Sequence, residues 1–276
     1  MIGKVARPAS LQELWPMLDD GLSPMAGGTD LLVPGRKAAG RGVALLEGLP
    51  GLDGVAMTAQ GLRLGALASL AALERHPVIR ERLPVLAQAI ACLGSPLIRN
   101  MGTMGGNLVT ASPAGDTLPA LLVLEAVVEL ASRDGRRHLP VAEFLLGPGR
   151  TALGPGEIVA AVRIALPPPG ASQHFEKVGR RDALAIAVAS LAALIVRDEA
   201  GRVVEARLAV GSLAPTARRC PSAEAALPGR RLDREALLEA GRRIRDEISP
   251  KGDLRATAAY RREMAGRLPL RLLTLA

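Results

Sequence analysis

Aromatic residues are scarce in this chain of 276 residues, which has only Trp15, Phe144, Phe175 and Tyr260. Proteins that bind single-stranded nucleic acids usually stack bases on several aromatic rings. The chain carries 35 Lys and Arg residues against 27 Asp and Glu residues, a formal charge of +8. A basic surface that binds nucleic acid would also need aromatic residues, and this chain has few. We therefore expect no nucleic-acid partner and interpret the charge as a solubility or docking property.

Cysteine is scarce as well. Cys92 and Cys220 lie far apart, and neither belongs to a CxxC pair or a Cys/His cluster. An iron–sulfur cluster or a structural zinc ion normally needs four protein ligands. The sequence predicts neither centre in this chain, so any such centre would belong to another chain. His76, His138 and His174 are isolated too, and we identify no catalytic acid or base.

Long apolar runs are missing. The longest uncharged runs, residues 83–98 and 100–115, have 16 residues each and contain Pro, Gly, Asn or Gln. A membrane-spanning helix needs about 20 mostly apolar residues, so we expect no membrane span. The first residues have no apolar stretch of the kind that a secretory signal requires, which makes the cytoplasm the expected compartment. With 49% apolar and 22% charged residues, the chain suits a soluble globular fold.

The first half of the chain shows a mixed pattern of helices and strands. We expect helices at residues 10–18, 70–75 (capped by Ser69) and 84–93, strands at 22–26 and 43–47, and a hairpin at 55–66 that turns at 59–61. Residues 99–116 contain four glycines and six Asn, Thr, Ser or Asp residues, with almost nothing to bury. This composition predicts a long polar loop, and such loops are usually functional.

The second half continues with the same mixture. We expect a helix at 118–125, capped by Asp116 or Thr117, and strands at 127–132 and 158–166. Pro167 to Gly170 reads PPPG, the strongest linker signal of the chain. We place a domain boundary there, between residues 1–170, with two subdomains of about 1–55 and 56–170, and residues 171–276. The second domain is expected to have strands at 173–178, 184–196 and 203–211, followed by helices at 233–247 and 254–264, an α+β arrangement.

Two glycine pairs suggest a ligand site. Gly27-Gly28 follows a strand and precedes a possible helix start at Thr29-Asp30, where free backbone N–H groups could bind a phosphate. Gly105-Gly106 lies in the polar segment, with the hydroxyl groups of Thr103 and Thr110 nearby. Two such loops could hold one diphosphate from two sides, although each pair could also be an ordinary tight turn. Neither matches GxGxxG or GxxxxGK[ST], so a Rossmann or P-loop site is not supported.

Four segments together resemble a known family. They are MAGGTDLLV (25–33), IRNMGTMGGNLVTASPAGDTLPALL (98–122), FEKVGRRDALAIAVAS (175–190) and RATAAYRREMAG (255–266). In this order they resemble the FAD-binding medium subunit of the molybdenum hydroxylases, a family that includes xanthine dehydrogenase and carbon monoxide dehydrogenase. The resemblance implies an α+β fold: a two-lobed FAD-binding domain of the vanillyl-alcohol-oxidase type followed by a small α+β C-terminal domain.

The resemblance also implies roles for individual residues. The first loop would wrap the FAD diphosphate, the second would hold it from the other side, Asp116 would hydrogen-bond the ribose or the flavin end, Leu93 and Val159 would pack against the adenine, and Lys177 would approach the isoalloxazine. The first loop comprises Met25, Ala26, Gly27, Gly28, Thr29, Asp30, Leu31 and Leu32, and the second comprises Thr103, Met104, Gly105, Gly106 and Asn107. Residues 25–33 contain no His or Cys that could tether the flavin, so non-covalent FAD is expected.

The function implied is that of an oxidoreductase component. FAD would pass electrons from a [2Fe–2S] cluster on a small partner subunit to NAD⁺, O₂ or another acceptor, while a large partner subunit would carry the molybdenum cofactor. The assembly would be a doubled heterotrimer, inactive on its organic substrate without the partner subunits. Two alternatives remain: a self-contained flavin oxidase acting on a small organic substrate, and a basic binding module without cofactor.

Several of these residues also have simpler interpretations. Asp116 could be a plain helix N-cap, Lys177 a surface lysine on an edge strand, and Leu93 part of the core. The arginines of the third and fourth segments, Arg180, Arg181, Arg261 and Arg262, could form a solvated face or a basic surface that meets a partner. Cys92 could be a small buried apolar residue.

Overall fold

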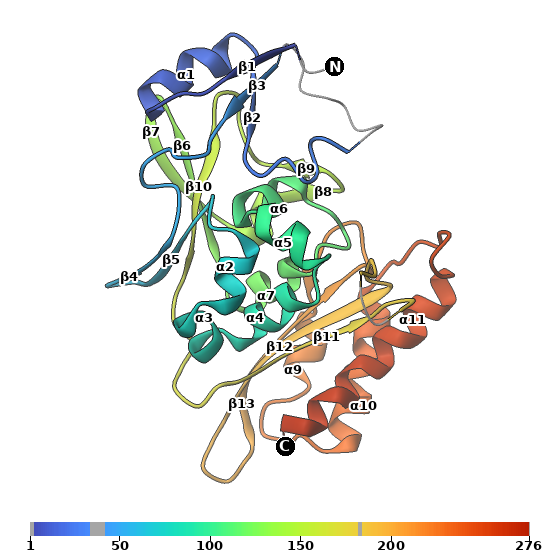
Figure 1. Cartoon of the computed structure of the whole chain (residues 1–276). Coiled ribbons are helices and arrows are strands. Elements are labelled where there is room, and N and C mark those ends of the chain that lie inside the picture. The colour runs from blue at the N-terminus through green and yellow to red at the C-terminus, as the bar shows by residue number, and fades with distance from the viewer. Residues whose placement is uncertain (1–2, 34–41, 182–183, 276) are drawn as a thin grey trace.

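A computed structural model describes residues 3–33, 42–181 and 184–275 (Figure 1). Helix α1 (Leu11–Asp19) lies over a parallel sheet of β1 (Lys4–Ala6), β3 (Gly42–Leu45) and β2 (Ser23–Met25), in the order β1-β3-β2. The hydroxyl oxygen of Ser10 accepts a hydrogen bond from the Glu13 N–H at 3.2 Å and caps α1. Leu14 and Leu52 are among the residues that fill the core beneath this helix. This small unit confirms the expected helix and both expected strands.

The second unit is an antiparallel sheet of five strands with helices against one face. Its order is β4 (Val55–Thr58), β5 (Gly61–Gly65), β10 (Ile158–Ile164), β6 (Val127–Ser132) and β7 (Gly135–Pro140). The expected hairpin is confirmed as β4–β5, but Gly61 pairs with Thr58 and belongs to β5 instead of the turn. The helices are α2 (Leu70–Arg75), α3 (Pro77–Arg82), α4 (Pro84–Ala91), α5 (Pro96–Met101), α6 (Met104–Thr110) and α7 (Thr117–Val123). After β7 come the short α8 (Val141–Phe144), β8 (Leu145–Gly147) and β9 (Arg150–Thr151).

The prediction of a long polar loop at residues 99–116 is wrong. Most of this segment belongs to α5 and α6, which are separated by Gly102 and Thr103. Ser95 and Thr103 cap the two helices through their side-chain oxygens, which accept hydrogen bonds from Ile98 N–H and Gly106 N–H. Met104 and Leu108 are fully buried on one side of α6. The helices form because two caps and two buried apolar residues offset the low helix propensity of the glycines.

The C-terminal unit is an antiparallel sheet followed by helices. Its strands are β11 (Ser172–Val178), β12 (Ala189–Arg197), β13 (Val203–Gly211) and β14 (Arg218–Arg219), and its helices are α9 (Pro221–Ala225), α10 (Arg234–Glu247), α11 (Ala258–Arg267) and the 3₁₀ segment η1 (Leu268–Leu275). The predicted first residues of one strand and one helix are wrong. The second strand begins at Ala189 rather than Leu184, whose φ of +55° is not extended backbone. The last helix begins at Ala258 rather than Leu254, because Asp253 accepts hydrogen bonds from the Arg255 and Ala256 N–H groups and forms a turn.

Strand β12 is buried on both faces and joins the second unit to the C-terminal unit. Leu191, Ala193 and Ile195 pack with the C-terminal helices, whereas Ala192 and Leu194 belong to the core of the second unit. Side chains alternate between the two faces of a strand. Helices α4 and α7 contact the sheet from one side, and η1 and α11 from the other (Figure 1). The mixed α+β class is confirmed, and one core continues past Pro167–Gly170.

The described segments contain no helix long and apolar enough to cross a membrane. They also contain no group of three or more His, Cys, Asp or Glu side chains that could hold a metal ion.

Candidate functional site

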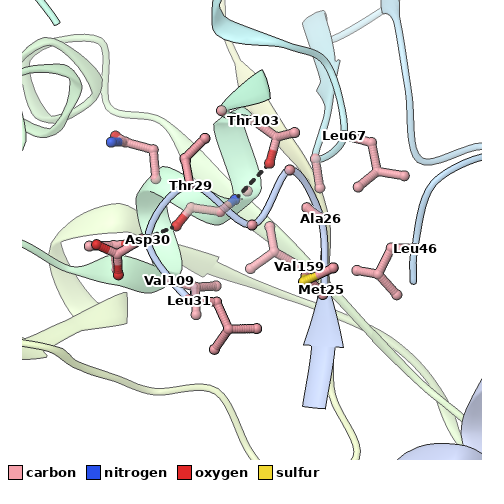
Figure 2. A pocket seen from close by; sticks show the side chains of 18 of the residues that line it. Met25, Ala26, Thr29, Asp30, Leu31, Leu46, Leu67, Thr103, Val109 and Val159 are labelled. Carbon is pink, nitrogen blue, oxygen red and sulfur yellow. Dashed lines mark hydrogen bonds between the residues drawn. The ribbon is translucent and has the colours of Figure 1, made fainter. Parts of the chain in front are cut away.

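A cavity of about 380 Å³ lies where the first glycine loop meets helix α6. This volume is typical of small-molecule sites. Figure 2 shows Thr29 and Asp30 of the loop on one side and Thr103, at the start of α6, on the other. Val159 of β10 and Leu93 after α4 line the same cavity. The tertiary structure therefore brings together segments that are up to 135 residues apart, from Pro24 to Val159.

Thirteen of the seventeen predicted site residues line this cavity. They are Met25, Ala26, Gly27, Gly28, Thr29, Asp30, Leu31, Leu93, Thr103, Gly105, Gly106, Asn107 and Val159. Leu32, Met104, Asp116 and Lys177 do not; Met104 is fully buried in the core. The sequence analysis missed apolar lining residues such as Leu46, Leu67 and Leu153. They carry no local signal, because an apolar residue beside a ligand looks like any other core residue.

The first loop rests directly on helix α5. A Cβ atom on Gly27 would lie 1.6 Å from the carbonyl oxygen of Met101, so only glycine permits this approach. Gly28 has a φ of +69°, a conformation that L side chains rarely adopt. The predicted helix start at Thr29-Asp30 is wrong: residues 29–33 form a turn, closed by a hydrogen bond from Leu32 N–H to Gly28 O at 3.0 Å. The loop therefore stays open toward the cavity.

The start of α6 is anchored to the turn between β5 and α2. The N–H groups of Met104 and Gly105 donate to Ala68 O at 3.1 Å and Ala66 O at 2.8 Å. A Cβ atom on Gly105 would lie 2.7 Å from the Ala66 Cβ, so this glycine allows the close packing. Gly106 differs, because its Cβ would meet only the Thr103 hydroxyl oxygen, at 3.0 Å. Of the two glycines, only Gly106 borders open space.

The backbone N–H groups of the two loops are used differently. In the second loop, the N–H groups of Met104, Gly105 and Gly106 all have protein acceptors, and Asn107 N–H donates to Thr103 O at 2.9 Å. In the first loop, the N–H groups of residues 26–29 have no protein acceptor within the described part of the chain. An anion in the cavity would therefore find its backbone donors on the first loop. This corrects the idea that both loops offer N–H groups equally.

The second loop offers side chains instead. The Thr117 hydroxyl donates a hydrogen bond to Asn107 Oδ1, which fixes the amide and leaves its Nδ2 hydrogens as donors. The Thr110 hydroxyl, an expected donor, is directed to Gly106 O at 3.0 Å. The cavity is thus lined by the first loop with its unpaired N–H groups, by Gly105 and Gly106, and by the fixed amide of Asn107. Leu93 and Val159 add apolar surface. These features fit the diphosphate and the adenine of a dinucleotide.

Asp116 and Lys177 form a buried ion pair outside the cavity lining. Asp116 Oδ2 and Lys177 Nζ are 2.6 Å apart, and Nζ also donates to Cys92 O at 2.8 Å. Burial raises the pKa of Asp116 to about 6, although the Lys177 charge and hydrogen bond act against the rise. Asp116 stands at the N-cap position of α7 but makes no capping hydrogen bond. Its other oxygen, Oδ1, is buried with no partner among the described residues, so it can accept a hydrogen bond from a ligand.

Three simpler interpretations are also wrong. Lys177 is buried rather than a solvated surface lysine. Cys92 is exposed at the end of α4. Arg261 is not part of a solvated face, because it is only 5% exposed.

Comparisons with known proteins identify the family of the chain. The family model described as "FAD binding domain in molybdopterin dehydrogenase" matches residues 2–167, and the model "CO dehydrogenase flavoprotein C-terminal domain" matches residues 173–276. The xanthine dehydrogenase FAD-binding subunit of Escherichia coli O157:H7 is 30% identical, over 92% of this chain and 89% of that one. The nicotinate dehydrogenase FAD-subunit of Eubacterium barkeri is 32% identical, over 87% and 82%.

A solved structure shows the same fold. A chain of carbon monoxide dehydrogenase from Hydrogenophaga pseudoflava superposes with a TM-score of 0.93 and 30% identity, covering 99% of this chain and 96% of that one. The expected arrangement of an FAD-binding domain followed by a C-terminal domain is therefore confirmed. On these grounds the chain belongs to the family of FAD-binding medium subunits of the molybdenum hydroxylases.

Proposed function

We propose that this chain is the electron-transfer subunit of a molybdenum hydroxylase, and that it holds FAD non-covalently in the cavity between the first loop and α6. The observation that carries the proposal is the cavity itself, since both glycine segments singled out in the sequence line it. Bound flavin can accept electrons one at a time and release them in pairs. The chain's part is to bind and orient the cofactor.

Different residues would bind the different parts of FAD. The free N–H groups of residues 26–29 would bind the diphosphate, and the Asn107 amide would add a donor from the other side. Each hydrogen bond to a charged phosphate contributes about 1.5–3 kcal/mol, so a few donors suffice for tight binding. Leu93 and Val159 would enclose the adenine. Asp116 and Lys177 lie outside the residues that line the cavity. We therefore assign them to the part of FAD farther from the adenine, the ribose or flavin end, where the unpartnered Asp116 Oδ1 would accept a hydrogen bond.

The partners follow from what the described residues lack. With no group of potential metal ligands among them, the [2Fe–2S] clusters and the molybdenum cofactor would belong to a small and a large subunit, in a doubled heterotrimer in the cytoplasm. The final acceptor would be NAD⁺ or another oxidant. Without its partners the chain would not oxidise an organic substrate.

The test is to purify the chain alone and within its native complex. The chain should be yellow and should release FAD, not FMN, after treatment with acid or heat. Iron, molybdenum and activity on an organic substrate should appear only with the complex. Flavin that stays attached to the denatured chain would contradict non-covalent binding. A monomer without iron or molybdenum that oxidises an organic donor would instead support the self-contained oxidase, and a colourless chain would support the basic binding module.

A further inference from the structure

A second cavity, of about 350 Å³, lies at the junction between the second unit and the C-terminal unit. Its walls come from the segment after α6 (112–114), the segment before β12 (186–187), the loop after β13 (212–215) and the loop before α11 (249–255), together with Arg261. None of its lining residues lines the FAD cavity. We propose that this cavity is a binding site for a small ligand that carries a phosphate group. The proposal goes beyond the function proposed above, and only its experiment uses bound FAD, to keep the first cavity filled.

Arg261 supplies a buried cation in the wall of this cavity. Its Nη1 donates to Val188 O at 2.6 Å and to Ser212 O at 3.2 Å, and its Nη2 donates to Asp253 Oδ1 at 2.8 Å. Its Nε is buried and has no hydrogen-bond partner among the described residues. The guanidinium group therefore places a positive charge in the wall of the cavity, and such a charge attracts an oxyanion.

The charges around the cavity favour an anion. Lys251, Arg255 and Arg261 line it together with a single carboxylate, Asp253, so cations outnumber anions by three to one. That carboxylate is already satisfied. Asp253 accepts hydrogen bonds from the Arg255 N–H, from the Arg261 and Arg255 guanidinium groups and from Ala256 N–H, which hold its pKa well below the usual range. No ion pair of Lys251 occurs among the described residues, which leaves its ammonium group for a ligand.

The polar walls are held in place before any ligand arrives. Ser212 has a φ of +64°, and its N–H donates to Pro113 O at 2.8 Å while its hydroxyl donates to Ala187 O at 2.9 Å. Ser249 N–H donates to Leu213 O at 3.1 Å. Strained backbone of this kind persists where the surroundings impose it, and such positions cluster at ligand sites. The hydroxyl groups of Ser112 and Ser249 also line the cavity and can donate to phosphate oxygens.

The experiment uses the full chain loaded with FAD, so that added phosphate cannot occupy the diphosphate position of the first cavity. Inorganic phosphate and a phosphate monoester, glycerol phosphate, are titrated separately by calorimetry at constant ionic strength. Saturable binding at one site is expected. Binding of inorganic phosphate would indicate a free-anion site, and a clear preference for the monoester would indicate a site for a larger phosphorylated ligand; both support the proposal.

Variants connect the binding to this cavity. Lys251→Gln should weaken phosphate binding about tenfold, the effect of losing one charge-assisted hydrogen bond. Lys4→Gln makes the same charge change on the exposed strand β1 and should have no effect. Arg261→Lys keeps the charge and removes the guanidinium donors that hold Ser212 and Asp253 in the cavity wall, and it should weaken phosphate binding in a chain that still retains FAD.

Three results would overturn the proposal. One is the absence of saturable phosphate binding by the FAD-loaded wild-type chain. The second is equal weakening by Lys251→Gln and Lys4→Gln, which would show a general effect of surface charge. The third is phosphate binding that occurs only without FAD, which would place the phosphate in the first cavity. If Arg261→Lys fails to fold, phosphate binding by the wild-type chain and the comparison of Lys251→Gln with Lys4→Gln still test the proposal.

Discussion

Three glycines at the FAD cavity illustrate how one residue type serves different purposes. Gly27 and Gly105 are needed for folding, since a Cβ atom at either position would collide with protein atoms, at 1.6 Å and 2.7 Å. Gly106 is exposed, and its Cβ would meet only the Thr103 hydroxyl oxygen. Substitution of Gly106 should therefore change mainly the affinity for FAD, whereas substitution of Gly27 or Gly105 should change mainly the stability of the fold.

We expect Gly106→Ala to separate stability from cofactor binding. Alanine favours a helix interior over glycine by about 1 kcal/mol, so thermal unfolding of the FAD-free chain should shift slightly upward. The methyl group would occupy space at the cavity floor, so the Kd for FAD should rise by about tenfold or more, the effect of one lost phosphate interaction. Fluorescence titration with FAD and thermal unfolding measure both effects.

Gly147→Ala is the matched control, because a Cβ there would make only ordinary contacts, at 3.9 Å from Arg150, and lies outside the cavity lining. It should leave FAD affinity unchanged. Unchanged FAD affinity of Gly106→Ala as well would show that the cofactor does not approach this glycine.

Glu129 is a second residue whose surroundings set its chemistry. Its side chain is 0% exposed in the middle of β6. Arg136 of β7 and Arg163 of β10, the two neighbouring strands, contact it, and so does Arg63 of β5, the strand beyond β10. Burial alone would raise its pKa, but hydrogen bonds from Arg63 and Arg163 outweigh this effect and lower the pKa to about 2. A carboxyl group whose pKa is lower in the folded state stabilises the fold above its unfolded pKa, and this stabilisation is lost as the pH falls through the folded pKa.

Glu129→Gln should therefore destabilise the chain most near neutral pH. Removal of one partner from a buried ion pair costs about 3–5 kcal/mol. The difference in unfolding free energy between wild type and variant should be constant above about pH 5 and shrink between about pH 4 and pH 2. Urea unfolding at several pH values measures it. A difference that does not change with pH would mean that the carboxylate charge is not the cause.

At the scale of elements, the first loop depends on the short helix beneath it. Gly27 contacts the carbonyl end of α5, and Leu70 N–H donates to Gly102 O at 2.8 Å, which ties α5 to α2. The loop that offers free N–H groups is thus positioned by a helix, α5, that has no buried residue of its own.

We expect Gly27→Ala to move the loop away from α5. Overpacking of this kind costs about 1–3 kcal/mol, so the variant should unfold at a lower temperature and also lose FAD affinity. Gly106→Ala provides the contrast, since it should lose affinity without losing stability. Wild-type FAD affinity in Gly27→Ala would show that the position of the loop on α5 does not matter for the cofactor.

At the scale of the whole molecule, the predicted domain boundary does not separate two cores. Phe175, Ala192, Leu194 and Ala209 lie after Pro167–Gly170 and belong to the same buried cluster as Leu86 of α4. Helices α4 and α7 therefore need the C-terminal sheet as a surface to pack on.

A fragment of residues 1–170 should consequently fail to fold cooperatively. Loss of the C-terminal sheet would expose the apolar faces of α4 and α7, and large exposed apolar patches promote aggregation. The fragment should bind a hydrophobic dye and show no sharp thermal transition by circular dichroism, unlike the full chain. A cooperative transition with FAD bound would instead show that residues 1–170 are an independent domain.

The sequence by itself determined the features that depend on neighbours along the chain. Two apolar runs on either side of residues 59–61 predicted the β4–β5 hairpin, Ser69 predicted the start of α2, and the two glycine pairs predicted a ligand site, because hairpins, caps and tight turns are local. The scarcity of cysteine, without a Cys/His cluster, led us to expect no iron–sulfur cluster and no structural zinc ion in this chain.

Only the tertiary structure decided what distant residues do to one another. Asp116 is paired with Lys177, 61 residues away, instead of capping α7. Arg261 is buried because the carbonyl groups of Val188 and Ser212 accept its hydrogen bonds. Residues 104–110 of the expected loop are helical because Met104 and Leu108 join a core that the polar composition does not reveal. In each case a partner distant in sequence supplies the free energy, and a pattern read along the chain contains no information about that partner.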